Sequence, residues 1–166
     1  MFAAVMLEDE ICKELLEMIL KIKIAKITIH AEKTIVYNPE YKGVRLDIEA
    51  EDEFHTHYDV EIQVNRKETL LRSRYYHSQM DMELLTAGTP YEKLPDSYVI
   101  FICDYDPFYQ KKYQYTLVQK CEEVPELDVS AGVHTIFLST KGKNDEEVSE
   151  ELKKFLKYVG TKLEES

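Results

Sequence analysis

The sequence predicts an α/β domain with a mixed central sheet flanked by helices. Two runs in which apolar and polar residues alternate, 44–50 and 58–64, are typical of strands with one buried and one polar face. A run with helical periodicity follows at 67–87, and a continuous apolar run follows that helix at 97–103. Because an unbroken apolar run indicates a strand covered on both faces, the order strand, helix, strand predicts a right-handed crossover and a parallel pair.

Length and composition indicate one globular domain that spans residues 1–166. Hydrophobic residues make up 44% of the chain and charged residues 32%, which excludes a disordered class. No apolar run approaches the ~20 residues that cross a membrane, and the N-terminal residues lack the basic region of a secretory signal. Three widely spaced cysteines favour neither a disulfide framework nor a zinc site, so we expect a cytoplasmic protein without membrane contact.

The first third of the chain is expected to form one helix and then one or two short strands. Residues 7–21 combine an apolar stripe with an acidic start, which is typical of a helix. Glu14 and Glu17 are assigned to the solvated face of that helix. Residues 22–37 are rich in Ile and Thr and alternate in part, which favours strands, and Asn38-Pro39 ends the pattern.

The hairpin turn and the helix behind it carry further expectations. His55 and His57 are interpreted as an exposed polar pair in the connection between the two alternating runs. In the helix 67–87, we expect Gly88 to form the C-terminal cap. The residues whose spacing places them on the inward face of this helix are Leu71, Tyr75, Ser78, Met82 and Leu85.

The last third of the chain predicts two more strands and a closing helix. Residues 113–121 and 133–139 have the composition of strands. Residues 146–158 have a helical apolar stripe, and Asn144 or Asp145 is the expected N-cap.

The two alternating runs have a register that follows from their pattern. If both apolar sets share the core, residues of like parity must pair across an antiparallel hairpin centred near Phe54. The resulting pairs are Asp47 with Glu61, Glu49 with Asp59, and Arg45 with Gln63. One face then carries four carboxylates that oppose one another, which is destabilising, so a divalent cation is the expected compensation. A simple solvated acidic face is the alternative.

A net charge of −11 disfavours a general nucleic-acid binder, because phosphate contacts require Lys and Arg. One clear basic cluster nevertheless stands out, in which Arg66, Lys67, Arg72 and Arg74 fall within nine residues. We expect Arg72, Arg74 and the neighbouring Tyr76 to contact a phosphodiester backbone. The alternative is that these arginines neutralise the acidic strands.

Asp47 on one strand, Glu61-x-Gln63 on the next and a helix behind them resemble the core of the PD-(D/E)xK nuclease superfamily. The closer resemblance is to the recombination-promoting nuclease/transposase family. It is carried by the segments GVRLDIEAED, YDVEIQV, RSRYYHSQMDMELLTAGTPYEKLPDSYVIFICDYDPF and FLKYV, which cover most of residues 43–158. The resemblance implies a restriction-endonuclease-like core, and it implies that a few residues normally precede Phe2.

The resemblance also implies a metal-dependent endonuclease that hydrolyses phosphodiester bonds of DNA in a recombination or mobile-element context. Asp47, Glu61 and Gln63 would be the catalytic side chains. Asp47, Glu61 and the backbone carbonyl of Ile62 would bind Mg²⁺ or Mn²⁺. Cutting both strands of a duplex would favour a homodimer.

Gln63 departs from the wider superfamily, in which the motif has lysine at this position. A glutamine amide can orient a water but cannot offset developing negative charge. Arg45, which faces Gln63 in the predicted register, is the expected source of the missing charge and a further contact for nucleic acid. The alternative function is a binding or assembly module that keeps the nuclease fold without catalysis, which the net charge and Gln63 favour.

Overall fold

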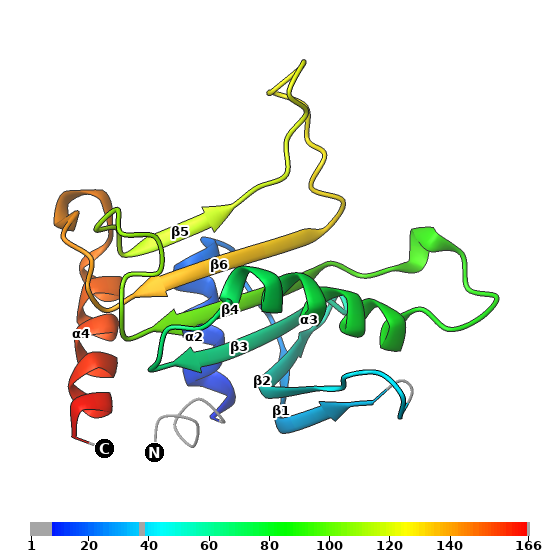
Figure 1. The fold of residues 1–166 in the computed structure, drawn as a ribbon, viewed down its shortest axis with the longest axis horizontal. Helices are drawn as coiled ribbons and strands as arrows, with labels where there is room; N and C mark the ends of the chain where they lie inside the picture. Colours follow the sequence, from blue (N-terminus) through cyan, green and yellow to red (C-terminus); the bar gives the residue numbers. More distant parts are fainter. Residues whose placement is uncertain (1–7, 37–38, 166) are drawn as a thin grey trace.

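The computed structural model describes residues 8–36 and 39–165, and within them a six-stranded sheet has the order β1-β2-β3-β4-β6-β5 (Figure 1). The strands are β1 (Ile27–Ile35), β2 (Val44–Asp52), β3 (His57–Gln63), β4 (Ser97–Cys103), β5 (Gln114–Leu117) and β6 (Val133–Ser139). The helices are α2 (Asp9–Leu20), α3 (Thr69–Leu84) and α4 (Glu150–Glu164), with short 3₁₀ turns η1 (Tyr91–Lys93) and η2 (Asp145–Glu147). The expectation about residues before Phe2 lies outside the described residues.

The sheet is mixed, as predicted. Strand β2 is antiparallel to β1 and β3, while β3, β4 and β6 are mutually parallel and β5 returns antiparallel to β6. The predicted register of the hairpin is confirmed, because Glu49 pairs with Asp59 and Ile48 with Val60. Helix α3 makes the predicted connection from β3 to its parallel neighbour β4. The carboxyl ends of the three parallel strands therefore meet at one edge of the sheet (Figure 1).

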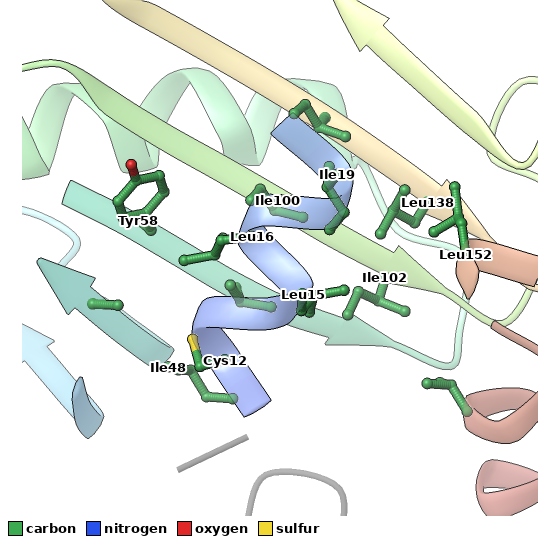
Figure 2. Packing of buried hydrophobic residues seen from close by; sticks show 14 of the residues in the cluster. Cys12, Leu15, Leu16, Ile19, Ile48, Tyr58, Ile100, Ile102, Leu138 and Leu152 are labelled. Carbon is green, nitrogen blue, oxygen red and sulfur yellow. The ribbon is translucent and has the colours of Figure 1, made fainter. Parts of the chain in front are cut away.

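Helices cover both faces of the sheet. On one face, Leu15, Leu16 and Ile19 of α2 pack with residues of α4 against apolar side chains of the central strands, as Figure 2 shows for Ile100 and Ile102. On the other face, α3 covers a smaller apolar cluster together with polar residues of the sheet. None of the helices within residues 8–36 and 39–165 is long and apolar enough to cross a membrane.

The apolar residues of β2 divide between the two sides of the sheet, so the predicted single buried face is wrong for this strand. Val44 and Leu46 pack on the α3 side, whereas Ile48 and Ala50 pack on the side of α2 and α4. The change of side coincides with Glu32 of β1, whose backbone is left-handed (φ 53°). The ladder between β2 and β3 ends at Ile48. The next residue, Asp47, therefore lies where the two strands separate.

Helix α3 is turned relative to the prediction. Leu71 is 58% exposed and Met82 is 42% exposed, so most of the stripe that was expected to face inward faces solvent, while Tyr75 is half-buried. The buried residues of the helix are Thr69, Ser73, Tyr76, His77, Gln79 and Met80. Most of them carry hydrogen-bonding groups, because the sheet face beneath α3 is itself partly polar. The prediction failed because it assumed that the most apolar stripe must be the buried one.

Two predicted helix caps are also wrong. Helix α3 ends at Leu84, and Gly88 lies beyond it in a separate turn, with φ 84°. Helix α4 begins after Ser149, whose Oγ accepts a hydrogen bond from the backbone N–H of Leu152 (3.2 Å). Asn144 instead accepts a hydrogen bond from the backbone N–H of Tyr113 (2.9 Å), so it fixes the start of β5 rather than that of α4.

Candidate active site

A cavity of about 260 Å³ lies at the carboxyl end of β3, between β2 and the first turns of α3. Its lining residues are Arg45, Asp47, Glu61, Ile62, Gln63, Val64, Asn65, Lys67 and Arg72. The fold thus brings together every residue that the sequence proposed for catalysis and for metal binding. A larger groove of about 1090 Å³ runs between α2, α4 and β5, and its lining among the described residues includes none of these. The smaller cavity is therefore the candidate active site.

Asp47 and Glu61 hold each other by reciprocal hydrogen bonds. The backbone N–H of Asp47 donates to Oε1 of Glu61 (3.0 Å), and the backbone N–H of Ile62 donates to Oδ2 of Asp47 (3.4 Å). These side-chain contacts take the place of the strand ladder, which has ended one residue earlier. Because each carboxylate is tied to the backbone of the other strand, both are positioned without a bound ligand.

Glu61 lies in an environment that disfavours its charge. It is buried, and burial raises its pKa to about 7, with the charge of Asp47 acting in the same direction. Asp59 lies two residues earlier on the same face and is fully buried. Burial and the nearby Glu61 carboxylate raise the pKa of Asp59 well above its ordinary value. Neither carboxylate oxygen of Asp59 has a hydrogen-bond partner in the described part of the chain.

The acidic face of the hairpin is thus buried beneath α3, and the alternative of a solvated face is excluded for these residues. Asp59 and Glu61 pair with Val99 and Phe101, which pack on the α3 side of the sheet. Glu49 belongs to the same buried row. Burying carboxylates is costly unless they are paired, so this row needs compensation.

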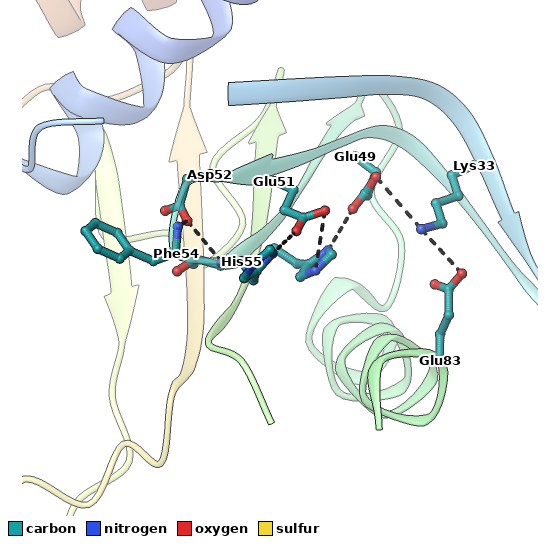
Figure 3. Close-up of polar contacts among 9 residues, drawn as sticks. Lys33, Glu49, Glu51, Asp52, Phe54, His55 and Glu83 are labelled. Atoms are coloured by element: carbon teal, nitrogen blue, oxygen red, sulfur yellow. Dashed lines mark hydrogen bonds and ion pairs between the residues drawn. The ribbon is translucent and has the colours of Figure 1, made fainter. Parts of the chain in front are cut away.

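Glu49 shows how one member of the row is compensated (Figure 3). Nδ1 of His57 lies 2.8 Å from Oε1 of Glu49, and Nζ of Lys33 lies 3.9 Å from Oε2 and 3.3 Å from a carboxylate oxygen of Glu83. Burial alone would raise the pKa of Glu49, but the hydrogen bond with His57 and the charge of Lys33 hold it below its ordinary value. The expectation that His57 is exposed is wrong, because His57 is needed beside Glu49, whereas His55 is exposed as predicted.

Gln63 is hydrogen-bonded to a cation. Nη1 of Arg72 donates to Oε1 of Gln63 (2.7 Å), and Nη2 of Arg72 donates to the hydroxyl of Tyr76 (2.7 Å). The guanidinium also lies over the ring of Tyr76, with Cζ 5.3 Å from the ring centroid. Two hydrogen bonds and an aromatic face therefore fix a positive charge at the wall of the cavity.

The sequence predicted that Arg45 would be the cation beside Gln63. In the structure, the cation that contacts Gln63 is Arg72. Arg45 lines the cavity, but its Nη2 lies 2.7 Å from Oε1 of Glu32 in an exposed ion pair. No sequence signal connected Arg72 to Gln63. The contact joins helix α3 to strand β3, and the apolar pattern of α3 predicted the wrong rotation of this helix relative to the sheet.

The basic cluster of the sequence divides in three dimensions. Arg72 and Lys67 line the cavity, Arg74 is exposed on α3, and Arg66 docks against the loop that follows β4. Lys67 and Asn65 were not among the proposed site residues. Their position directly after the Glu-x-Gln strand is the signal that could have identified them.

An α/β sheet that presents an Asp and a Glu-x-Gln pair from adjacent strands, beside a fixed arginine, defines a nuclease-type domain. The whole chain, residues 1–166, matches the family described as PD-(D/E)XK nuclease family transposase, and the chain belongs to this family. Its members act on nucleic acid and typically use divalent metals. A comparison with curated proteins gave no match.

The donor set suits one kind of metal ion better than others. Among the described residues, no group of three or more His, Cys, Asp or Glu side chains is arranged to hold a metal. Asp47 and Glu61 offer two hard oxygen ligands at the cavity, which Ile62 also lines. That set fits an ion such as Mg²⁺, which keeps several waters and uses one or two carboxylates.

Proposed function

We propose that this protein is a metal-dependent endonuclease that hydrolyses phosphodiester bonds of DNA in a recombination or mobile-element context. The observation that supports this best is the cavity in which Asp47 and the buried Glu61 are held together opposite a fixed arginine. A structural ion pair would place that arginine on the carboxylates. Here Arg72 is bonded to Gln63 and Tyr76, so its charge remains directed at the cavity.

Asp47, Glu61 and the carbonyl of Ile62 would hold Mg²⁺ or Mn²⁺ at this cavity. A metal there supplies polarisation of the phosphoryl oxygens and a lowered pKa for the attacking water. The raised pKa of Glu61 implies that metal binding displaces a proton from the site, so metal affinity should increase with pH.

Gln63 and Arg72 would act together on the phosphate. Oε1 of Gln63 accepts from Arg72, and the amide N–H₂ of Gln63 remains as a donor for a ligand. A donor suits a phosphate oxygen. Arg72 supplies the positive charge that glutamine lacks, and that charge favours a transition state in which negative charge develops.

The remaining contacts to nucleic acid would come from the rim. Arg45 and Arg74 are exposed and can reach phosphates. Tyr76 is 9% exposed and accepts a hydrogen bond from Arg72, so we propose that its contribution to binding is indirect. The net charge of −11 confines productive binding to this rim. A cytoplasmic location and a homodimer that cuts both strands complete the proposal.

Nicking of supercoiled plasmid DNA tests the proposal. The parent protein should nick in Mg²⁺ or Mn²⁺ and not in EDTA. Asp47→Asn keeps the shape but removes a ligand charge, so nicking should fall more than about 100-fold, beyond the effect of losing an outer partner of a metal site. The matched control is Glu14→Gln, which removes an exposed carboxylate on α2 and should leave the rate unchanged.

Thermal melts separate a metal site from a structural acidic row. Millimolar Mn²⁺ should raise the melting temperature of the parent, because a ligand of the native state adds stability as RT ln(1 + [L]/Kd). Asp47→Asn should be at least as stable as the parent without metal and should show no gain with it. A parent that neither responds to Mn²⁺ nor nicks DNA, yet binds DNA, would establish the alternative of a binding module.

A further inference from the structure

The loop that follows β4 begins directly beside the candidate active site. Cys103 pairs with Gln63, and the backbone N–H of Asp104 donates to the carbonyl of Gln63 (2.9 Å). The segment from Asp104 to Lys112 then extends past the carboxyl ends of the parallel strands (Figure 1). A nucleic acid whose phosphate enters the cavity therefore passes close to this loop.

Resting on the proposed function, we propose that Tyr109 in this loop is a stacking platform for an unpaired base of the nucleic acid next to the scissile phosphate. The side chain is 71% exposed. Cζ of Arg66 lies 4.4 Å from the centroid of its ring, so one ring face rests on the guanidinium. With that face covered, the large exposure leaves the opposite face open to a ligand.

Arg66 connects this ring to the cavity. Its neighbours in the chain, Asn65 and Lys67, both line the cavity. Its Nη2 donates to the carbonyl of Asp106 (2.7 Å), and its Nη1 donates to that of Pro107 (3.3 Å). The guanidinium thereby fixes the loop to the segment that forms the wall of the site.

The loop is organised around the carboxylate of Asp106. This carboxylate accepts hydrogen bonds from the backbone N–H groups of Phe108, Tyr109 and Lys111 and from the hydroxyl of Tyr115. Tyr109 and Lys111 have left-handed backbones (φ 58° and 59°), which is an uncommon conformation for such residues. Tyr109 is therefore positioned in advance, and binding a base to it requires little additional ordering.

Stacking suits this protein because it does not depend on charge. With 32 Asp and Glu against 21 Lys and Arg, the net charge of −11 disfavours phosphate contacts, whereas every base has a face that can stack on an aromatic ring. Bases inside a continuous duplex are covered on both faces by their neighbours. The platform therefore selects nucleic acid with an unpaired base beside the cleavage point, as at a single strand, a gap or a branch.

Fluorescence anisotropy in EDTA tests the platform independently of catalysis, using a labelled single-stranded DNA oligonucleotide and a blunt duplex of the same sequence. Tyr109→Ala should weaken binding of the single strand about 5- to 150-fold and change duplex binding much less. Tyr109→Phe keeps the ring and should bind like the parent, whereas Tyr109→Leu should lose affinity like Ala. The control is Tyr91→Ala, because Tyr91 is 84% exposed on η1 and should not matter.

Unchanged single-strand affinity in Tyr109→Ala, or an equal loss in Tyr109→Phe, would overturn the platform, as would a parent that binds neither probe. Plasmid nicking reports separately on the proposed function. A parent that nicks while Tyr109→Ala binds normally refutes the platform alone. A parent that does not nick, but loses single-strand affinity in Tyr109→Ala, supports the platform and refutes the nuclease.

Discussion

The two faces of the central sheet are both buried but are built differently. The face beneath α2 and α4 packs aliphatic side chains against one another, with Leu16 and Leu156 fully buried. The face beneath α3 combines an apolar cluster with the buried acids Glu49, Asp59 and Glu61. Apolar burial stabilises the fold, whereas burial of a carboxylate opposes it unless the charge is paired. The first face therefore stabilises the fold, whereas the second face holds the buried acids of the candidate active site.

The α3 face also shows a division within itself. Glu49 has His57 and Lys33 as partners, and its pKa lies below the ordinary value. Burial raises the pKa values of both Asp59 and Glu61; the charge of Glu61 adds to the rise at Asp59, the charge of Asp47 adds to the rise at Glu61, and Arg72 offsets only part of the rise at Asp59. A fully compensated row would have placed a cation beside every acid. The end of the row next to the cavity is only partly compensated, as the proposed metal site would require.

Substitution in the apolar face should have the largest effect on stability. Leu16→Ala removes a side chain of α2 that is 0% exposed and leaves a cavity among aliphatic neighbours (Figure 2). We expect the free energy of unfolding to fall by about 2–5 kcal/mol. Chemical denaturation followed by circular dichroism measures this change.

The control for that prediction is the same substitution on α3. Leu71 has the same side chain but is 58% exposed, so Leu71→Ala should change the free energy of unfolding by less than about 0.5 kcal/mol. Equal losses in both variants would mean that Leu71 is buried in solution and that α3 has the rotation predicted from its apolar stripe. That result would remove the difference between the two faces.

A pH series on the metal-free protein should separate the two kinds of buried acid. Glu61 has a folded pKa of about 7, above the unfolded value, so the folded state binds the extra proton and stability falls as pH rises from about 4.5 to about 7. Glu61→Gln removes this loss. Its free energy of unfolding, minus that of the parent, should increase across the same window.

Glu49→Gln should show the opposite behaviour. The folded pKa of Glu49 is lowered, so its contribution to stability is present above the unfolded value near 4.5 and is lost as pH falls through the folded pKa. This variant should be less stable than the parent at pH 7, and the deficit should shrink in acid. His77, whose burial lowers its pKa to about 4, is present in all three proteins and largely cancels in the differences. For each variant, the free energy of unfolding minus that of the parent is followed as pH rises. If this difference changes in the same direction for Glu61→Gln and Glu49→Gln, the division between paired and unpaired acids is contradicted.

The sequence predicted the elements of the sheet well and the covering helix poorly. If apolar residues are to share a core, a period of two fixes which residues can pair to within slips of two, and a hairpin centred near Phe54 then gives the observed pairing of Glu49 with Asp59. The same rule could not foresee that the apolar residues of β2 change sides next to Asp47, a change that coincides with the left-handed backbone of Glu32 in the neighbouring strand. The rotation of α3 was predicted wrongly, and with it the contact of Arg72 was missed.

Helices α3 and α4 differ at their N-termini. Helix α4 on the apolar face has Ser149 as a cap, with a side-chain hydrogen bond to the first turn. Helix α3 begins after Glu68, and within the part of the chain that the structure describes this residue makes no side-chain capping bond. The first turn of α3 also contains no acidic residue that would complement the helix dipole. Helix α3, which covers the candidate active site, is therefore the less optimised of the two.

The smallest expected effect follows from this difference. Glu68→Ser introduces a residue that is favoured at the N-cap, because its short hydroxyl can accept a hydrogen bond from a free N–H group in the first turn of α3. We expect the free energy of unfolding to rise by up to about 1 kcal/mol. Glu68→Gln is the matched control, since it removes the same charge from an acidic chain without supplying a good cap. If Ser and Gln stabilise equally, the gain comes from charge alone and α3 does not lack a cap. A gain with Ser only would show that the start of α3, four residues before Arg72, lacks a capping hydrogen bond that a single hydroxyl can supply.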